Sequence, residues 1–190
     1  MSKRQKIRVF IWLVILVVFW GWVLYEDQSL DAKQIAYFLA RFQNFIIIVY
    51  FLFSSFRAFT LIPNLTVVLV GTLVIEDSYI LLCLSILGFI ISSSIIYFFG
   101  QQTGLYNIFM LKYSARIEDI EQKIQKFGSP IIFLWGLLPI VPSDLLTFVL
   151  GTIKFDYKKM IFLYFFSHFI TYTLIIFTSK TLWKILISNL

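Results

Sequence analysis

Long uncharged stretches of apolar residues dominate the chain, and three of them have the length of a membrane-spanning helix. They occupy residues 9–25, 79–99 and 160–179. An α-helix rises about 1.5 Å per residue, so about 20 apolar residues cross a hydrocarbon layer of about 30 Å. The pattern therefore predicts three full transmembrane helices.

Two further apolar segments, 44–75 and 130–153, are interrupted by proline. Both contain a proline, seven or eight mostly apolar positions and then Gly-Thr, in LIPNLTVVLVGTL and IVPSDLLTFVLGTI. Pro63 and Pro142 break the helix, and the arms that follow them, of about 18 Å and about 16 Å, are too short to cross alone. We interpret the segments as re-entrant hairpins that enter from opposite faces and meet near the middle of the membrane. The alternative is that each proline only kinks an ordinary span.

Two opposed hairpins with broken helices form an inverted repeat, which is typical of transporters whose site lies at the bilayer midplane. Gly71 and Gly151 are expected to let the returning arms pack closely. Unpaired peptide groups at the hairpin tips are tolerated only where protein or water satisfies them. The tips are therefore the expected place for a site.

Two other segments, 33–42 and 117–127, have the spacing of amphipathic helices. Each is predicted to lie along the membrane surface, and a solvated connector helix packed on its own protein is an equal alternative. The apolar positions that recur at helical spacing are Ile35, Phe38, Leu39, Phe42, Ile117, Ile120, Ile124 and Phe127.

Composition leads to the same class of protein. Of 190 residues, 60% are hydrophobic and only 14% charged, which identifies an all-α integral membrane protein. The formal net charge of +6 is spread over loops and termini instead of forming a basic stripe, so nucleic acid is not expected as a partner. We expect an anchor helix and connector in 1–43, the membrane domain in 44–179 and a tail in 180–190.

Charged residues near the span ends predict the orientation of the chain. The basic residues Lys3, Arg4, Lys6 and Arg8 place the N-terminus in the cytoplasm, and the first span is expected to be a retained anchor rather than a cleaved signal peptide. The charges at the far end leave the side of the C-terminus open. Small size and a composition rich in Ile, Phe and Lys favour a bacterial plasma membrane.

Two charged residues fall inside the predicted hairpins, Arg57 and Asp144. A lone charge in hydrocarbon costs about 3 kcal/mol by insertion scales, so each needs a partner or a wet cavity, and the two are expected to pair. The pair is either purely structural or part of a site where a lipid phosphate replaces the carboxylate or Asp144 takes up a proton. Asn64 and Ser143 lie at the tips and are candidates to bind a headgroup, although Ser143 also suits a helix cap.

Two other side chains are expected only to pack. A solitary histidine in the last span, His168, is more often hydrogen-bonded packing than a proton relay. Cys83 is the one cysteine, which excludes an intramolecular disulfide, and it is expected to be a small packing residue inside its span.

The order of these segments resembles a known family. FRAFTLIPNLTVVLVGTL, then LCLSILGFIISSSIIYFFGQQTG, a charged amphipathic helix and FGSPIIFLWGLLPIVPSDLLTFVLGTIKFDYKKMIFLYF are similar to the DedA or VTT-domain superfamily, within it to SNARE-associated Golgi protein-like members. The most specific part is Pro139-x-x-Pro142 with Asp144 and Gly151. This chain has Gly136 and Gln101 where relatives often carry arginine.

The resemblance implies two opposed re-entrant hairpins and movement of lipids across bilayers. In that family, phospholipid scrambling is implied in eukaryotes, and recycling of undecaprenyl phosphate or phosphatidylethanolamine in bacteria. We therefore expect a translocator of phospholipid or polyprenyl-phosphate headgroups, with membrane lipids as partners and protons or a second copy of the chain as open ones. The expected translocation residues are Arg57, Pro63, Asn64, Gly71, Pro139, Pro142, Ser143, Asp144 and Gly151.

Other function classes remain beside this expectation. A membrane scaffold or assembly factor is the main alternative, because polar hairpins can serve folding alone. An intramembrane enzyme is disfavoured by the single histidine and by the lack of a hydrolase elbow or a metalloprotease motif. No cofactor and no metal are expected.

Overall fold

The computed structural model describes residues 41–57, 60, 62–102, 126–138 and 143–188, together with a few single positions elsewhere. Its helices are η1 (Gln43–Phe45), α3 (Ile46–Phe56), α4 (Asn64–Val74), α5 (Ser78–Gln102), α7 (Ser143–Thr152) and α8 (Tyr157–Ser188). Residues 126–137 are helical as well, and no strand occurs in the part of the chain that is described.

Several predicted elements lie largely outside the described residues. They are the span 9–25 and most of the two amphipathic segments, 33–42 and 117–127. Pro139 and Pro142 also fall outside.

In the described part of the chain, two helices are long and apolar enough to cross a membrane, α5 and residues 157–179 of α8. They match the spans predicted over 79–99 and 160–179. The helices α3, α4 and α7 have only 11, 11 and 10 residues, about half the length that a bilayer requires. The all-helical class and two of the three predicted long helices are therefore confirmed.

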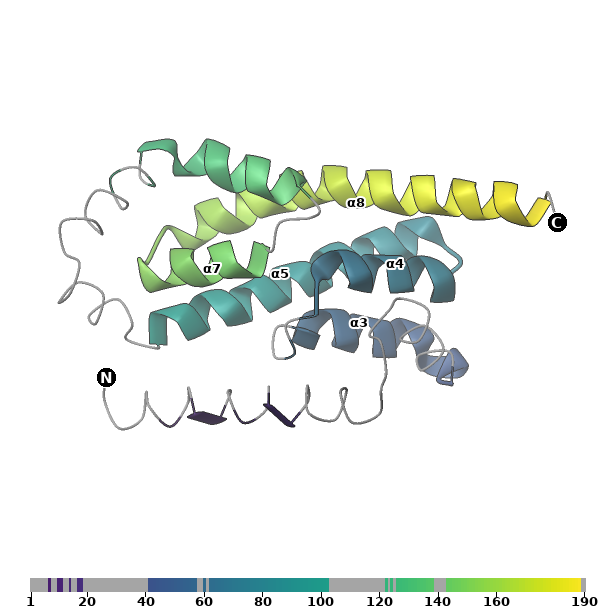
Figure 1. Cartoon of the computed structure of the whole chain (residues 1–190), viewed down its shortest axis with the longest axis horizontal. Helices are drawn as coiled ribbons and strands as arrows, with labels where there is room; N and C mark the ends of the chain where they lie inside the picture. Colours follow the sequence, from purple (N-terminus) through teal and green to yellow (C-terminus); the bar gives the residue numbers. More distant parts are fainter. Residues whose placement is uncertain are drawn as a thin grey trace.

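The short helices form two hairpins whose tips face each other (Figure 1). The chain reverses between α3 and α4, which lie in contact, so Pro63 does not merely kink one continuous helix. Helix 126–137 and α7 reverse in the same way from the other end of the molecule. As a result, α4 and α7 begin near the middle of the long axis and run toward opposite ends.

Each hairpin is followed by a short turn and a long helix, and an aspartate caps each of these helices. The Asp77 carboxylate accepts hydrogen bonds from the backbone N–H groups of Tyr79 and Ile80, at 2.8 and 2.9 Å. Asp156 accepts one from the N–H of Lys159 at 2.8 Å. These bonds satisfy donors that a helix N-terminus leaves unpaired. The two turns lie at opposite ends of the molecule (Figure 1).

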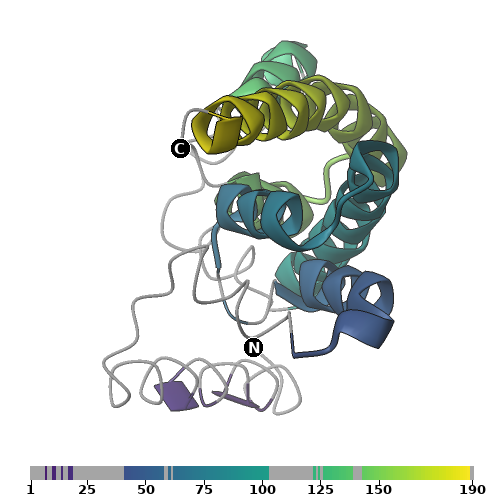
Figure 2. The same cartoon turned by 90° about the vertical axis from the view of Figure 1, so that its right-hand side faces the viewer.

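The long helix α5 is the centre of the packing and contacts α3, α4, α7 and α8. Viewed along the molecule, α8 and α3 lie on opposite sides, with α4 and α5 between them (Figure 2). The buried face of α5 includes Leu81, Ser85 and Phe89. Cys83 lies within α5, as predicted, but it lies off this face and is exposed, so the prediction that it is a packing residue is wrong.

Both glycines of the repeated pattern allow close helix contact, as predicted. A Cβ atom at Gly151 would collide with the backbone of Tyr97, including its carbonyl carbon at 2.9 Å, so α7 rests directly on α5. A Cβ atom at Gly71 would meet the Tyr50 hydroxyl at 2.8 Å and the side chain of Leu81. Gly71 and Gly151 therefore position α4 and α7 from the helix ends that point away from the hairpin tips.

Candidate functional site

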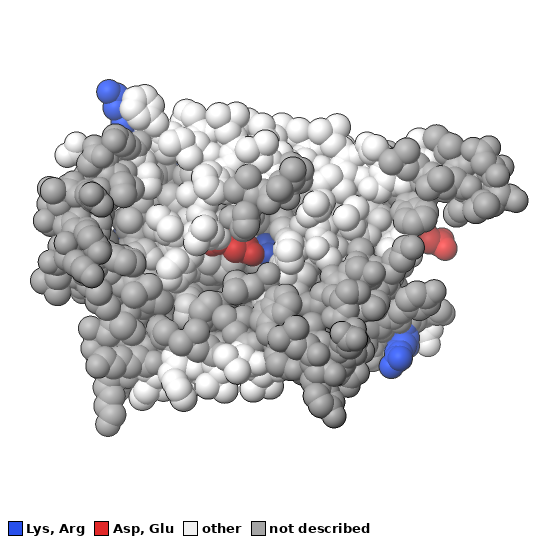
Figure 3. Space-filling view, in the orientation of Figure 1, with Lys and Arg blue, Asp and Glu red and all other residues white. Residues whose placement is uncertain are grey.

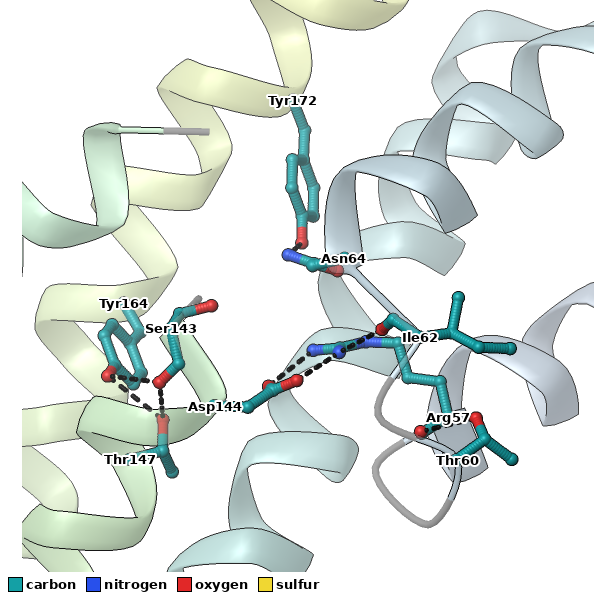
Figure 4. A network of polar contacts seen from close by, with 9 residues as sticks. All are labelled: Arg57, Thr60, Ile62, Asn64, Ser143, Asp144, Thr147, Tyr164 and Tyr172. Atoms are coloured by element: carbon teal, nitrogen blue, oxygen red, sulfur yellow. Dashed lines mark hydrogen bonds and ion pairs between the residues drawn. The ribbon is translucent and has the colours of Figure 1, made fainter. Parts of the chain in front are cut away.

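The two charges inside the hairpins form an ion pair where the tips meet (Figure 4). The two terminal nitrogens of Arg57 donate to the two carboxylate oxygens of Asp144, at 2.7 and 3.0 Å. Arg57 is the residue at which α3 ends, and Asp144 lies in the first turn of α7. Each helix dipole therefore favours the charge at its own end. The pairing expected from the sequence is confirmed.

The ion pair is largely withdrawn from solvent. The side chain of Arg57 is 0% exposed and that of Asp144 is 16% exposed. Among the described residues on the face shown in Figure 3, charged atoms gather at the middle of the long axis and near the ends, with uncharged atoms between. Removing two charges from water costs desolvation free energy. The two charge-assisted hydrogen bonds of a bidentate pair offset that cost.

The Arg57 guanidinium has hydrogen-bonding capacity beyond its two bonds to Asp144. Nη1 also reaches the carbonyl oxygen of Ile62 at 3.3 Å, and the guanidinium carbon lies 5.9 Å from the ring centre of Phe89. The buried Nε has no hydrogen-bond partner in the described part of the chain. Because an unpaired buried donor is unfavourable, this nitrogen is suited to a further acceptor oxygen.

The loop that carries Arg57 is tied to its own backbone. Thr60 donates to the Arg57 carbonyl oxygen through both its N–H and its hydroxyl, at 2.9 Å each. Pro63 directly precedes α4 and supplies an extended backbone there. The peptide groups at the first tip are thus partly satisfied by the tip itself, as membrane depth would require.

Two tyrosines of α8 reach the two hairpin tips (Figure 4). At the first tip, the Asn64 side-chain amide donates to the Tyr172 hydroxyl. At the second tip, the Tyr164 hydroxyl lies 3.0 Å from the hydroxyl of Thr147 and donates to the carbonyl oxygen of Ser143 at 3.4 Å. Asn64 and Ser143 are therefore held at the tips, next to the ion pair.

A stripe of polar aromatic residues on α8 lies against Phe89 of α5. The ring of His168 stacks on Phe89 at 3.7 Å between centres, and Tyr164 and Tyr172 contact Phe89 edge-on at 5.5 and 6.2 Å. His168 is buried, and its Nδ1 lies 3.1 Å from the Tyr164 carbonyl oxygen. The packing role predicted for His168 is confirmed.

Of the nine predicted site residues, Pro63 precedes α4, Pro139 and Pro142 lie outside the described residues, and the other six divide into two groups. Arg57, Asn64, Ser143 and Asp144 come together at the tips, whereas Gly71 and Gly151 act on helix packing. Four further residues at this site, Tyr164, Tyr172, Thr147 and Phe89, were not predicted from the sequence. The spacing of Tyr, His and Tyr at i, i+4 and i+8 in an apolar helix was the available signal.

Among the described residues, no group of three or more His, Cys, Asp or Glu side chains is placed to hold a metal ion.

In comparisons with known proteins, the model of the VTT domain matches residues 61–181, which is more than half of the chain. Asp144 lies inside the matched range, and Arg57 lies just before it. No curated protein and no solved structure matches the chain.

Proposed function

The chain belongs to the VTT-domain family, and from this premise we propose that it moves phosphate-bearing lipid headgroups across a membrane. The family and the two apolar helices indicate a membrane protein. The proposed substrates are phospholipids or polyprenyl phosphates, and the proposed site is the Arg57–Asp144 pair. We propose no chemical change of the lipid.

The arrangement in the membrane is part of the proposal. Residues 9–25 would add a third span, and the two hairpins would be re-entrant, entering from opposite faces. Support comes from the short helices α3, α4 and α7 and from the opposite ends at which the turn of Asp77 and the turn of Asp156 lie. The N-terminus would be cytoplasmic, and the membrane would be a bacterial plasma membrane.

The observation that carries the proposal is the bidentate ion pair between two opposed hairpin tips, with Nε of Arg57 unpaired among the described residues. Arginine binds phosphate through two parallel N–H donors, so the guanidinium suits a headgroup. Asp144 balances the buried charge of Arg57 when no headgroup is bound. A phosphate then either replaces the carboxylate or binds while Asp144 takes up a proton.

The test is lipid movement in vesicles that contain the purified protein and a fluorescent phospholipid. If the protein translocates lipid, a membrane-impermeant quencher reaches lipid that started in both leaflets. Arg57→Lys keeps the positive charge but loses the two parallel N–H donors of the guanidinium. We therefore expect lipid translocation to be at least about tenfold slower. Asp144→Asn is expected to slow it as well. Asp77→Asn is the matched control, because asparagine preserves the helix cap far from the site.

Two outcomes would overturn the proposal: quenching limited to the outer leaflet for the unmodified protein, or equal rates for Arg57→Lys and Asp77→Asn. A proton gradient across the vesicle then separates the two modes of binding. Replacement of the carboxylate predicts a rate that is independent of the gradient, and proton uptake by Asp144 predicts dependence on it.

A membrane scaffold is the second candidate, and one observation favours it. The Arg57 side chain is fully buried, as in ion pairs that serve folding alone. In that case the protein would leave labelled lipid in its original leaflet, and the pair would be replaceable by apolar residues without loss of function.

A further inference from the structure

Each hairpin tip has its own hydroxyl partner on α8. Asn64, the first residue of α4, donates to Tyr172, and Ser143, the first residue of α7, accepts from Tyr164. The residues that begin α4 and α7 are thus bound to one and the same helix. Figure 4 shows both tyrosines on α8, with the ion pair lying between the segments that they hold.

The two tyrosines are placed to act as a pair. They are eight residues apart, which puts them about two turns apart on one side of α8, about 12 Å apart along its axis. His168 lies between them, with ring centres 5.5 Å from Tyr164 and 5.3 Å from Tyr172. Both tyrosines are buried, at 0% and 2% exposed. Their rings are therefore fixed by packing, and their hydroxyls have defined positions.

Phenylalanine would fill the same volume without any polar atom. A buried hydroxyl lowers stability unless it is hydrogen-bonded, and a satisfied polar contact in a core selects one arrangement of the elements around it. The Tyr172 hydroxyl contacts Asn64 at the first tip, and the Tyr164 hydroxyl contacts both Ser143 at the second tip and Thr147, one turn further along α7. The hydroxyls therefore determine where the tips lie relative to α8, whereas the rings determine how α8 packs on α5.

We propose that Tyr172 and Tyr164 are positioning residues that hold the first and the second hairpin tip separately against α8. When one of these bonds opens, its tip moves away from α8 and the Arg57–Asp144 contact opens with it. Because the two tips are bound eight residues apart, each is released without the other. The admission of a lipid headgroup at the opened pair rests on the proposed function, and the release of the tips does not.

Cysteine labelling tests the release independently of transport. In a Cys83→Ala background, a reporter cysteine is placed at the first tip by Ile62→Cys or at the second by Ser143→Cys. Both positions are buried, at 2% and 6% exposed, and their carbonyl groups are retained. Each reporter is combined with Tyr172→Phe, Tyr164→Phe or Tyr50→Phe and treated with a membrane-impermeant maleimide.

Each tyrosine variant is expected to change the labelling rate at its own tip and not at the other. Tyr172→Phe increases the labelling rate at the first tip only, and Tyr164→Phe increases it at the second tip only. The increase is about threefold, which corresponds to about 0.6 kcal/mol, the mean strength of side-chain hydrogen bonds in a membrane protein. Tyr50→Phe is the matched control, because it removes a buried hydroxyl bond of 2.7 Å to Ser85 that reaches neither tip.

Equal increases at both reporters, or increases no larger than those of Tyr50→Phe, would overturn the inference. If a reporter cysteine prevents folding, a double-mutant cycle between Asn64→Ala and Tyr172→Phe replaces the labelling. The free energy of unfolding of the double variant must then be no lower than that of the less stable single variant. If each tyrosine variant increases labelling only at its own tip but the protein moves no lipid, the release of the tips is confirmed and the proposed function is rejected.

Discussion

Arg57 and Asp144 lie 87 residues apart in the sequence, and two hydrogen bonds join them at the point where the hairpin tips meet. Arg57 ends a helix and Asp144 begins one, so neither residue interrupts a helix to reach the other. The contact therefore joins the two halves of the fold at their most irregular points.

Removing one member of this pair should lower stability more than removing both. Asp144→Ala leaves the buried Arg57 uncompensated, and we expect a loss of about 3–5 kcal/mol in the free energy of unfolding. The double variant Arg57→Met with Asp144→Leu should recover most of this loss. Thermal unfolding in detergent measures both. A double variant as unstable as Asp144→Ala would contradict the prediction.

A methyl group at Gly151 should destabilise the contact between α7 and α5. Its neighbour is the backbone of Tyr97, which cannot move without moving α5, so Gly151→Ala should cost about 1–3 kcal/mol. Gly128→Ala is the control. There the nearest atom is the Ile124 methyl group at 3.1 Å, which can shift, and alanine favours a helix over glycine by up to about 1 kcal/mol. Equal unfolding temperatures for the two variants would show that α7 does not rest on α5 as described.

The two aspartate caps should contribute similar and independent amounts. Asp77→Ala and Asp156→Ala each remove a carboxylate that accepts from a helix N-terminus, and each should cost about 1 kcal/mol. Because the turns lie at opposite ends, the double variant should lose the sum of the two effects. Unfolding measurements on the three variants check both statements. A double loss well above the sum would mean that the ends are coupled.

Cys83 should react from the lipid and not from water. It is exposed on α5, which is long and apolar enough to span a bilayer. In vesicles, a lipid-soluble maleimide should label it, and a charged, membrane-impermeant one should not. The control is Glu76→Cys, at the exposed turn before α5, in a Cys83→Ala background. There the charged reagent should react. Fast reaction of Cys83 with the charged reagent would place this face of α5 in water.

The features that could be predicted from the sequence are those that a single physical limit determines. The first residues of α4 and α7 follow from Pro63 and from the proline before Ser143, because a helix begins readily after proline. The long helices α5 and α8 follow from apolar length. The ion pair follows from the cost of a lone charge in an apolar segment. Each of these inferences needs only local sequence or one strong penalty.

The remaining features depend on how the helices are rotated about their axes. The contact between Asn64 and Tyr172 joins residues 108 positions apart, and it requires the final orientation of α4 and α8 together. The exposure of Cys83 has the same origin, because α5 is apolar on every side and its pattern does not identify the buried face. Helix α8 also continues to Ser188, past the predicted end at 179, since Lys180 and Lys184 end an apolar run without ending a helix.

The long separation between Arg57 and Asp144 has a consequence for biosynthesis. Arg57 leaves the ribosome many seconds before Asp144, at a synthesis rate of about 5–20 residues per second. During that interval the first hairpin holds a cation without its carboxylate. Because a lone charge in hydrocarbon is costly, we expect this half of the protein to stay at the water boundary until the second hairpin emerges. A nascent chain stopped before residue 143 should accordingly be a target for membrane proteases.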